Sequence, residues 1–133
     1  MVDTWNGLDA HMFGDGPELA DELLALILAG KKTASCWAAA EGLKGAVVGK
    51  PFAVKDGAGV VRCVLETIEL TQRRYCDVDA AFAFEEGEDD RTLASWRDGH
   101  RAYFTRNGGF APDMLLWCER FRLVEVIGEG AEA

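Results

Sequence analysis

The stretch GKKTASCW, residues 30–37, brings together two lysines, two hydroxyl side chains and an aromatic ring. Apolar residues at three- and four-residue spacing precede it, as in an amphipathic helix: Leu19, Leu23, Leu24, Ile27 and Leu28. Pro17 suits the first position of that helix, and Gly30 suits a left-handed cap at its end. The stretch therefore predicts a helix end at which a small polar substrate could be held and attacked.

Each prominent residue of this stretch also fits a purely structural role. Lys31 and Lys32 complement the negative end of a helix dipole without any ligand. Trp37 is either a platform for a stacked base or an ordinary core residue. Cys36 could be nucleophilic, although a small buried thiol is the commoner state.

The rest of the chain predicts alternating strands and helices. A strand begins at residues 33–35, and a short helical or irregular stretch follows it to residue 40. The sequence DGAG, residues 56–59, is a strong hairpin signal between two apolar, β-branched runs. Further elements are expected at these positions: strands over 52–55, 60–70 and 115–126, and helices over 78–84 and 92–104.

This order predicts one α+β domain over residues 1–133, with antiparallel or mixed strand pairing rather than a doubly wound sheet. Residues 1–12 are expected to form a short helix packed on the body. Residues 128–133 are expected to be a frayed tail.

Composition limits the class of protein. A chain of 133 residues with 49% hydrophobic residues can bury one ordinary core. It has no charged-then-apolar leader and no apolar run of membrane-spanning length, so we expect a cytoplasmic protein that does not enter a membrane. The four cysteines lack paired spacing and the two histidines lie far apart, so we expect reduced thiols, no metal and no cofactor.

The net charge of −9 restricts the partners. Nucleic-acid affinity draws on Lys and Arg that neutralise phosphates, so tight and extended RNA contact is disfavoured. A nucleoside, with few or no phosphates, is easier to reconcile with the acidic balance. A local basic rim would need the fold to gather Lys31, Lys32, Arg73, Arg74, Arg101 and Arg106.

Three segments resemble one known family. PELADELLALILAGKKTASCW, residues 17–37, is similar to the opening of an ASCH domain, whose motif is Gly-x-Lys followed by hydroxyl residues. FEEGEDDRTLASWRDGHRAYF, residues 84–104, and FAPDMLLWCERFRLVEV, residues 110–126, resemble later parts of the same domain. The resemblance implies a small PUA-like β-barrel with helices packed around it, and it implies a fold more uniform than the function.

One branch of that family, the acetylcytidine amidohydrolases, implies a catalytic set. A lysine, a hydroxyl three positions later and a distal glutamate correspond by position to Lys32, Ser35 and Glu88. The branch carries Thr where Ser35 stands, which retains the hydroxyl, and Glu86 or Asp89 are alternatives to Glu88. In this scheme a lysine whose pKa is lowered takes the proton of the nucleophilic hydroxyl.

Strand geometry constrains this set. Residues three apart face opposite sides of a strand, so Lys32 and Ser35 can meet only if Lys32 lies in the turn before the strand. Thr33 shares a face with Ser35. The residues expected to contact the substrate without reacting are Lys31, Thr33, Trp37, Arg73 and Arg101.

Three function classes remain open. The first is a hydrolase that cleaves an acyl group from a modified nucleoside. The second is an RNA-binding module without turnover, and the third is an ASCH-type ribonuclease. The expected partner is accordingly a modified nucleoside or a short single-stranded RNA, and both a monomer and a homodimer are compatible with the sequence.

Overall fold

The helix that precedes the GKKTASCW stretch forms as its periodicity predicts. In the computed structural model, which describes residues 7–127, helix α1 spans Pro17–Leu28. Gly30 adopts a φ of +78°, the left-handed region that favours glycine, and its backbone N–H donates to the carbonyl of Ile27. This turn leads the chain directly into strand β2 (Ala34–Ala38).

The described strands form one mixed sheet in the order β1-β3-β4-β5-β2. Besides β2, its members are β1 (Ala10–Met12), β3 (Pro51–Lys55), β4 (Val61–Arg74) and β5 (Leu115–Val126). Strand β1 pairs in parallel with β3, and every other pair of neighbours is antiparallel. The predicted α+β class with mixed pairing is confirmed.

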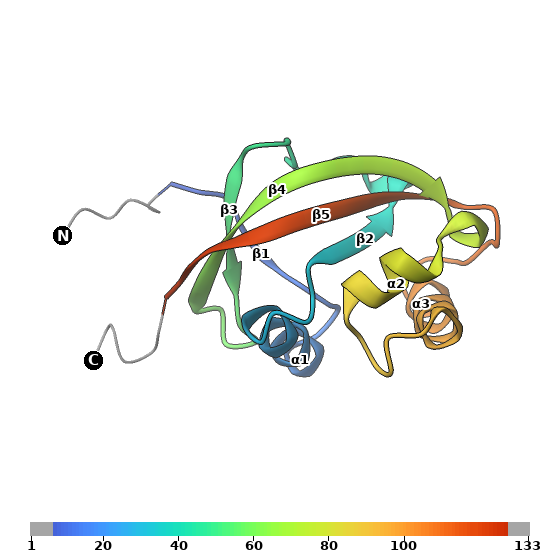
Figure 1. The fold of residues 1–133 in the computed structure, drawn as a ribbon, viewed down its shortest axis with the longest axis horizontal. Helices are drawn as coiled ribbons and strands as arrows, with labels where there is room; N and C mark the ends of the chain where they lie inside the picture. The colour runs from blue at the N-terminus through green and yellow to red at the C-terminus, as the bar shows by residue number, and fades with distance from the viewer. Residues whose placement is uncertain (1–6, 128–133) are drawn as a thin grey trace.

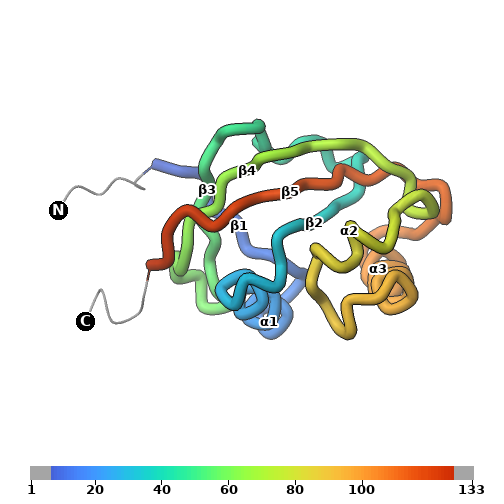
Figure 2. The backbone as a smooth tube through the Cα atoms, in the orientation of Figure 1, coloured from blue at the N-terminus to red at the C-terminus, as the bar shows by residue number. Residues whose placement is uncertain are grey.

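Strands β4 and β5 are the two longest described strands, and they arch side by side over the helices (Figure 1). Their pairing register shifts between Val64 and Leu65 and between Thr67 and Glu69. Such bulges bend and twist a strand, which accounts for the arch that the tube trace also follows (Figure 2). Strand β4 runs four residues beyond the predicted end at residue 70, to Arg74.

The DGAG hairpin is confirmed between β3 and β4. The carboxylate of Asp56 accepts hydrogen bonds from the backbone N–H groups of Ala58 and Val60. This Asx-type bonding stabilises the turn locally, and Asp21 of α1 accepts a further 2.7 Å hydrogen bond from the Gly57 backbone N–H.

Two further helices complete the layer beneath the sheet. Helix α2 spans Ala80–Glu86 and helix α3 spans Leu93–Arg106, and the side chains of Asp79 and Thr92 cap their first turns. Short 3-10 turns lie at Ala39–Glu41 and Tyr75–Asp77. Around α2 and α3 the core contains mainly aromatic and small residues: Ala34, Tyr75, Val78, Phe82, Ala83, Trp96, Phe104, Leu116 and Cys118.

A second core cluster lies between α1 and the sheet. It comprises Leu24, Ile27, Phe52, Val54, Cys63, Leu65 and Phe121. The described residues thus form two apolar clusters, and Ala34 of the GKKTASCW stretch belongs to the first of them. No helix within residues 7–127 combines the length and the apolar character needed to cross a membrane.

The expected N-terminal helix over residues 1–12 is wrong where the structure describes it. Residues 10–12 form strand β1, and the backbone N–H of Ala53 donates to the Asp9 carbonyl. The edge of β3 offers unpaired backbone groups, and pairing with them outweighs a helix too short to be stable alone. Residues 1–6 and the predicted tail at 128–133 lie outside the described range.

Candidate functional site

Lys32 is almost fully buried between two carboxylates. It lies in the turn before β2 and has an exposed fraction of 2%. Its Nζ donates to Glu86 Oε1 at 2.9 Å and to Glu88 Oε2 at 2.8 Å. A third, longer bond of 3.3 Å goes to the Glu86 backbone carbonyl. An ammonium has three N–H donors, so every donor of Lys32 is in use.

These contacts fix the charge of Lys32. Burial acts to lower the pKa of Lys32, but the adjacent Glu86 and Glu88 carboxylates outweigh it, and the net effect is a pKa above its ordinary value. Lys32 is therefore an ammonium near neutral pH. A lysine that takes a proton from a hydroxyl needs the opposite shift, so the structure disagrees with the lowered pKa expected from the sequence.

The two carboxylates differ from one another. Burial raises the pKa of Glu86, but Lys32, His100 and the Trp96 indole N–H together lower it to about 2. Burial raises the pKa of Glu88, and Lys32 only partly offsets this effect. The Glu88 side chain is also 27% exposed, against 1% for Glu86. Glu86 is thus a fixed anion, whereas Glu88 is the more basic and more accessible carboxylate.

A backbone contact positions this ion-pair cluster. Gly87, directly after α2, has a φ of +74°, and a Cβ built there would lie 2.2 Å from the Lys31 carbonyl oxygen. The Thr33 backbone N–H donates to the Glu85 carbonyl at 2.8 Å. The end of α2 is therefore docked closely on the turn that carries Lys32.

The cluster borders a pocket of about 360 Å³ beneath the sheet. Every described strand contributes to its walls, through residues such as Met12, Phe52 and Thr67, and so do α1 and α3. Glu86 and Glu88 both line it. The volume is at the lower end of the range of small-molecule sites, about 300–1,000 Å³.

Ser35 and Trp37 line the same pocket. Within residues 7–127 the Ser35 hydroxyl has no side-chain hydrogen bond, so it is available to a ligand. Trp37 is half-buried, and its indole N–H donates to the Gly42 carbonyl at 2.7 Å. Lys32 lies in the turn before β2, as a contact with Ser35 would require. The contact itself stays a prediction.

Four of the expected substrate-contacting residues lie away from the pocket walls. Arg73 Nη1 lies 3.6 Å from Asp79 Oδ2, and the Arg101 guanidinium lies over the Phe110 ring. The Thr33 hydroxyl donates to the Glu85 carbonyl, and Lys31 is exposed. The predicted basic rim is not formed at this pocket: of its six residues only Arg106 lines the walls, and Arg106 pairs with Asp15 at 2.6 Å.

Sequence reasoning missed two polar features of the pocket, one buried carboxylate and one grouping of side chains. Glu119 lies opposite Ser35 in the β2–β5 register and accepts a 2.6 Å hydrogen bond from the Thr67 hydroxyl. Burial raises the pKa of Glu119. The available signal was a pair of charged residues, Glu119 and Arg120, inside the otherwise apolar segment LLWCERF.

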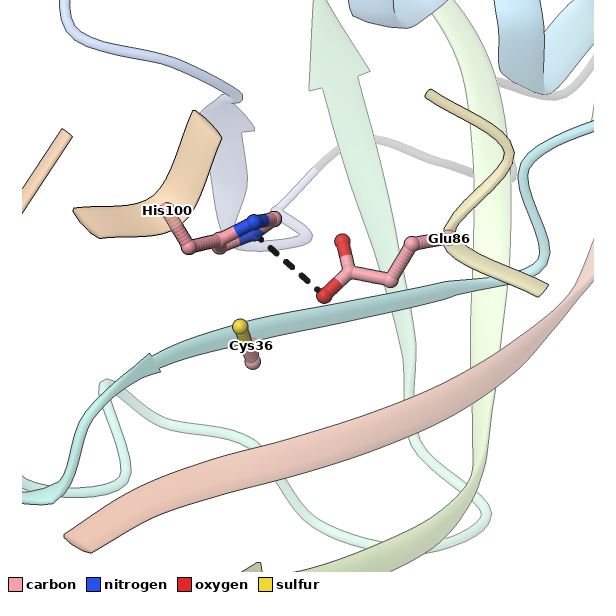
Figure 3. Close-up of side chains that lie close together, drawn as sticks. All are labelled: Cys36, Glu86 and His100. Carbon is pink, nitrogen blue, oxygen red and sulfur yellow. Dashed lines mark ion pairs between the residues drawn. The ribbon is translucent and has the colours of Figure 1, made fainter. Parts of the chain in front are cut away.

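The second missed group contains Cys36, Glu86 and His100 (Figure 3). Their ligand atoms lie within 4.8 Å of one another, although β2, α2 and α3 supply them separately. Burial raises the pKa of Cys36 well above its ordinary value. Spacing along the sequence could not reveal this cluster, because only the fold brings Cys36 to His100.

Comparison with known proteins places these observations in a family context. A family model for the ASCH domain matches residues 9–125. The structure of an ASCH domain from Lactobacillus crispatus is 33% identical, with a TM-score of 0.80 over 88% of this chain and 79% of that one. A protein from Enterococcus faecalis is 28% identical, with a TM-score of 0.82 over 94% of this chain and 81% of that one.

A third structure, ASCH from Zymomonas mobilis, is 13% identical, with a TM-score of 0.56 over 83% of this chain and 69% of that one. At that identity the likeness concerns the fold alone. The comparison with curated proteins gave no match for the chain.

Proposed function

The chain belongs to the ASCH domain family, with its PUA-like α+β fold, and from this membership we propose that it is a hydrolase that removes an acyl group from a modified nucleoside. One observation carries the proposal. The buried Lys32 ion-pair cluster borders a pocket lined by both Glu88 and Ser35, and the Ser35 hydroxyl has no side-chain hydrogen bond to any residue of the described range 7–127. A hydroxyl nucleophile and a carboxylate with a raised pKa are two components that acyl transfer needs.

The proposed chemistry assigns a different task to each residue. Ser35 Oγ attacks the acyl carbon, and its proton passes to the Glu88 carboxylate. Glu88 then gives that proton to the nucleoside nitrogen as the C–N bond breaks, leaving the acyl group as an ester on Ser35. Water cleaves the ester, which releases the carboxylic acid and restores the hydroxyl.

Lys32 is a positioning residue in this scheme. It is charged and all its N–H groups are bonded, so it holds Glu86 and Glu88 in place rather than accepting a proton. Glu88 takes the role of base because its pKa is raised and its side chain is partly exposed.

Charge favours a nucleoside over RNA as the ligand. Acidic residues outnumber cationic ones among the pocket walls. Two of the cations there are already paired, Lys44 with Glu41 at 2.6 Å and Lys50 with Asp9 at 2.9 Å. Few cations remain to neutralise phosphates. Trp37 offers an aromatic face for a base, worth about 1–3 kcal/mol if a base stacks on it.

The first test is the nucleophile. We expect Ser35→Ala to abolish the release of acetate from N4-acetylcytidine and Ser35→Thr to retain part of it, because threonine keeps the hydroxyl. Ser95→Ala, at a serine outside the pocket walls, is the matched control and should keep full turnover. Full deacylation by folded Ser35→Ala at saturating substrate would exclude the nucleophile assignment.

The second test separates hydrolysis from RNA cleavage. Glu88→Gln removes the proton acceptor, and Lys32→Arg replaces a compact ammonium by a planar guanidinium that does not fit the same three acceptors. Both should lose deacylation. These two variants and Ser35→Ala are also assayed with a short single-stranded RNA. RNA cleavage that is lost in Glu88→Gln but retained in Ser35→Ala would favour the ribonuclease.

A further inference from the structure

Cys36, Glu86 and His100 form a second chemical group within the same pocket. All three line it, and their side chains converge from a strand and two different helices (Figure 3). Glu86 is buried, while Cys36 and His100 are half-buried. The group supplies one sulfur, one carboxylate oxygen and one ring nitrogen, none of which takes a bond-forming part in the hydrolysis proposed above.

The orientation of His100 is fixed by its surroundings. Its Nδ1 lies 2.9 Å from the Trp96 carbonyl oxygen, and its ring stacks on Trp96 at 4.3 Å between centroids with an interplanar angle of 19°. A carbonyl can only accept, so Nδ1 carries the hydrogen. When Nε2 carries no proton, its lone pair faces Glu86 (Figure 3).

That lone pair faces another acceptor. Nε2 of His100 lies 3.5 Å from Glu86 Oε2. Two acceptors at this separation repel one another unless a cation, either a proton or a metal ion, lies between them. A histidine that donates its other N–H to a backbone carbonyl is the usual arrangement of a metal-ligating imidazole.

The local charge also favours a cation. Lys32 contributes one positive charge against the two carboxylates of Glu86 and Glu88. Glu86 uses Oε1 for Lys32, while Oε2 accepts from the Trp96 indole N–H at 3.0 Å and lies 3.5 Å from His100 Nε2. A divalent ion with a Cys36 thiolate would bring the whole group to neutrality.

We propose that Cys36, Glu86 and His100 bind a zinc ion, with a fourth position open to the pocket. Zinc accepts sulfur, nitrogen and carboxylate oxygen together, and sites with three protein ligands keep one position for water. Bond lengths of about 2.0–2.3 Å place tetrahedral ligand atoms about 3.3–3.8 Å apart. The Glu86–His100 separation of 3.5 Å already fits, and the Cys36 sulfur, within 4.8 Å of both atoms, would have to move at most about 1 Å closer.

The experiment titrates the metal-free full chain with Zn²⁺ by calorimetry, without any substrate, so its result is independent of the hydrolase proposal. We expect one ion per chain, and an affinity at least about 100-fold lower in Cys36→Ser and in His100→Gln. The controls are the other histidine, His11→Gln, and the exposed thiol, Cys76→Ser, which should bind as the wild type does.

Two further readouts identify the ligands. Co²⁺ bound to the wild type should show a sulfur-to-cobalt charge-transfer band in the near ultraviolet, and the band should be absent from Cys36→Ser. Zn²⁺ should raise the Tm of the wild type and of both controls but not that of the site variants, because preferential binding to the folded state is what raises Tm. Equal Zn²⁺ affinity in the wild type and both folded site variants would overturn the proposal, and so would a wild type that binds no Zn²⁺.

Discussion

Lys32 shows how a single residue can change its meaning between sequence and structure. As one of two adjacent lysines after a helix, it reads as a solvated cation or a member of a basic rim. In the fold it is buried, and transfer of an ammonium out of water costs several kcal/mol unless partners compensate. Glu86 and Glu88 supply that compensation, so the stability contributed by each of the three residues depends on the other two.

Glu86→Gln tests this dependence. The pKa of Glu86 is lowered from an ordinary value of 4.5 to about 2, which means that the folded state stabilises the ionised carboxylate. The stabilisation is therefore fully present above about pH 4.5 and is lost as pH falls toward about 2. We expect Glu86→Gln to lower the free energy of unfolding by about 3–5 kcal/mol at neutral pH.

The measurement is urea unfolding of both proteins across this pH range. The gap between wild type and Glu86→Gln should narrow on acidification. Glu18→Gln, at an exposed position of α1, serves as the control and should show no comparable gap. A gap that stays constant with pH would mean that Glu86 does not act through its charge.

At the scale of elements, local chemistry determined most of what the sequence could predict. Helix α1, the DGAG hairpin and strand β5 are confirmed because periodicity and turn residues specify them within a few neighbouring positions. Strand β1 was missed because it exists only through pairing with β3. The site divides in the same way: the resemblance indicated Lys32, Ser35 and Glu88, but no local signal connects Cys36 to His100.

Gly87 controls how α2 docks on the turn that carries Lys32. Gly87→Ala would force a Cβ against the Lys31 carbonyl, in addition to the strain of a left-handed φ. Gly30 has a similar φ of +78° but no atom within 4 Å of a built Cβ, so Gly30→Ala carries the strain alone. We expect Gly30→Ala to lower the free energy of unfolding by about 1–2 kcal/mol. We expect Gly87→Ala to lower it by about 1–3 kcal/mol more than Gly30→Ala does.

Thermal and urea unfolding measure the loss of stability in both variants. Deacylation is then assayed and expressed per amount of folded protein. Gly87→Ala should also lose turnover, because displacing α2 moves Glu86 and Glu88 away from Lys32. Equal stability of the two variants would show that the close approach at Gly87 is unimportant for docking.

For the whole molecule, charge is the property that most restricts function. The net charge of −9 and the acidic pocket walls leave few cations for a phosphate backbone. A ligand that releases few counterions on binding should show little salt dependence, whereas each neutralised phosphate of a single strand contributes about −0.7 to the slope of log affinity against log salt. We therefore expect the affinity for a cytidine derivative to be nearly constant between low and physiological salt.

Calorimetric titrations at increasing sodium chloride, with N4-acetylcytidine and with a short single-stranded RNA, provide the comparison. Ser35→Ala allows the nucleoside to be titrated without turnover. The RNA should bind weakly at every salt concentration, because the cations that line the pocket pair with neighbouring carboxylates, as Lys44, Lys50 and Arg106 do. A tightly bound RNA whose affinity falls steeply with salt would instead identify a phosphate-binding face on this acidic molecule and favour the RNA-binding function.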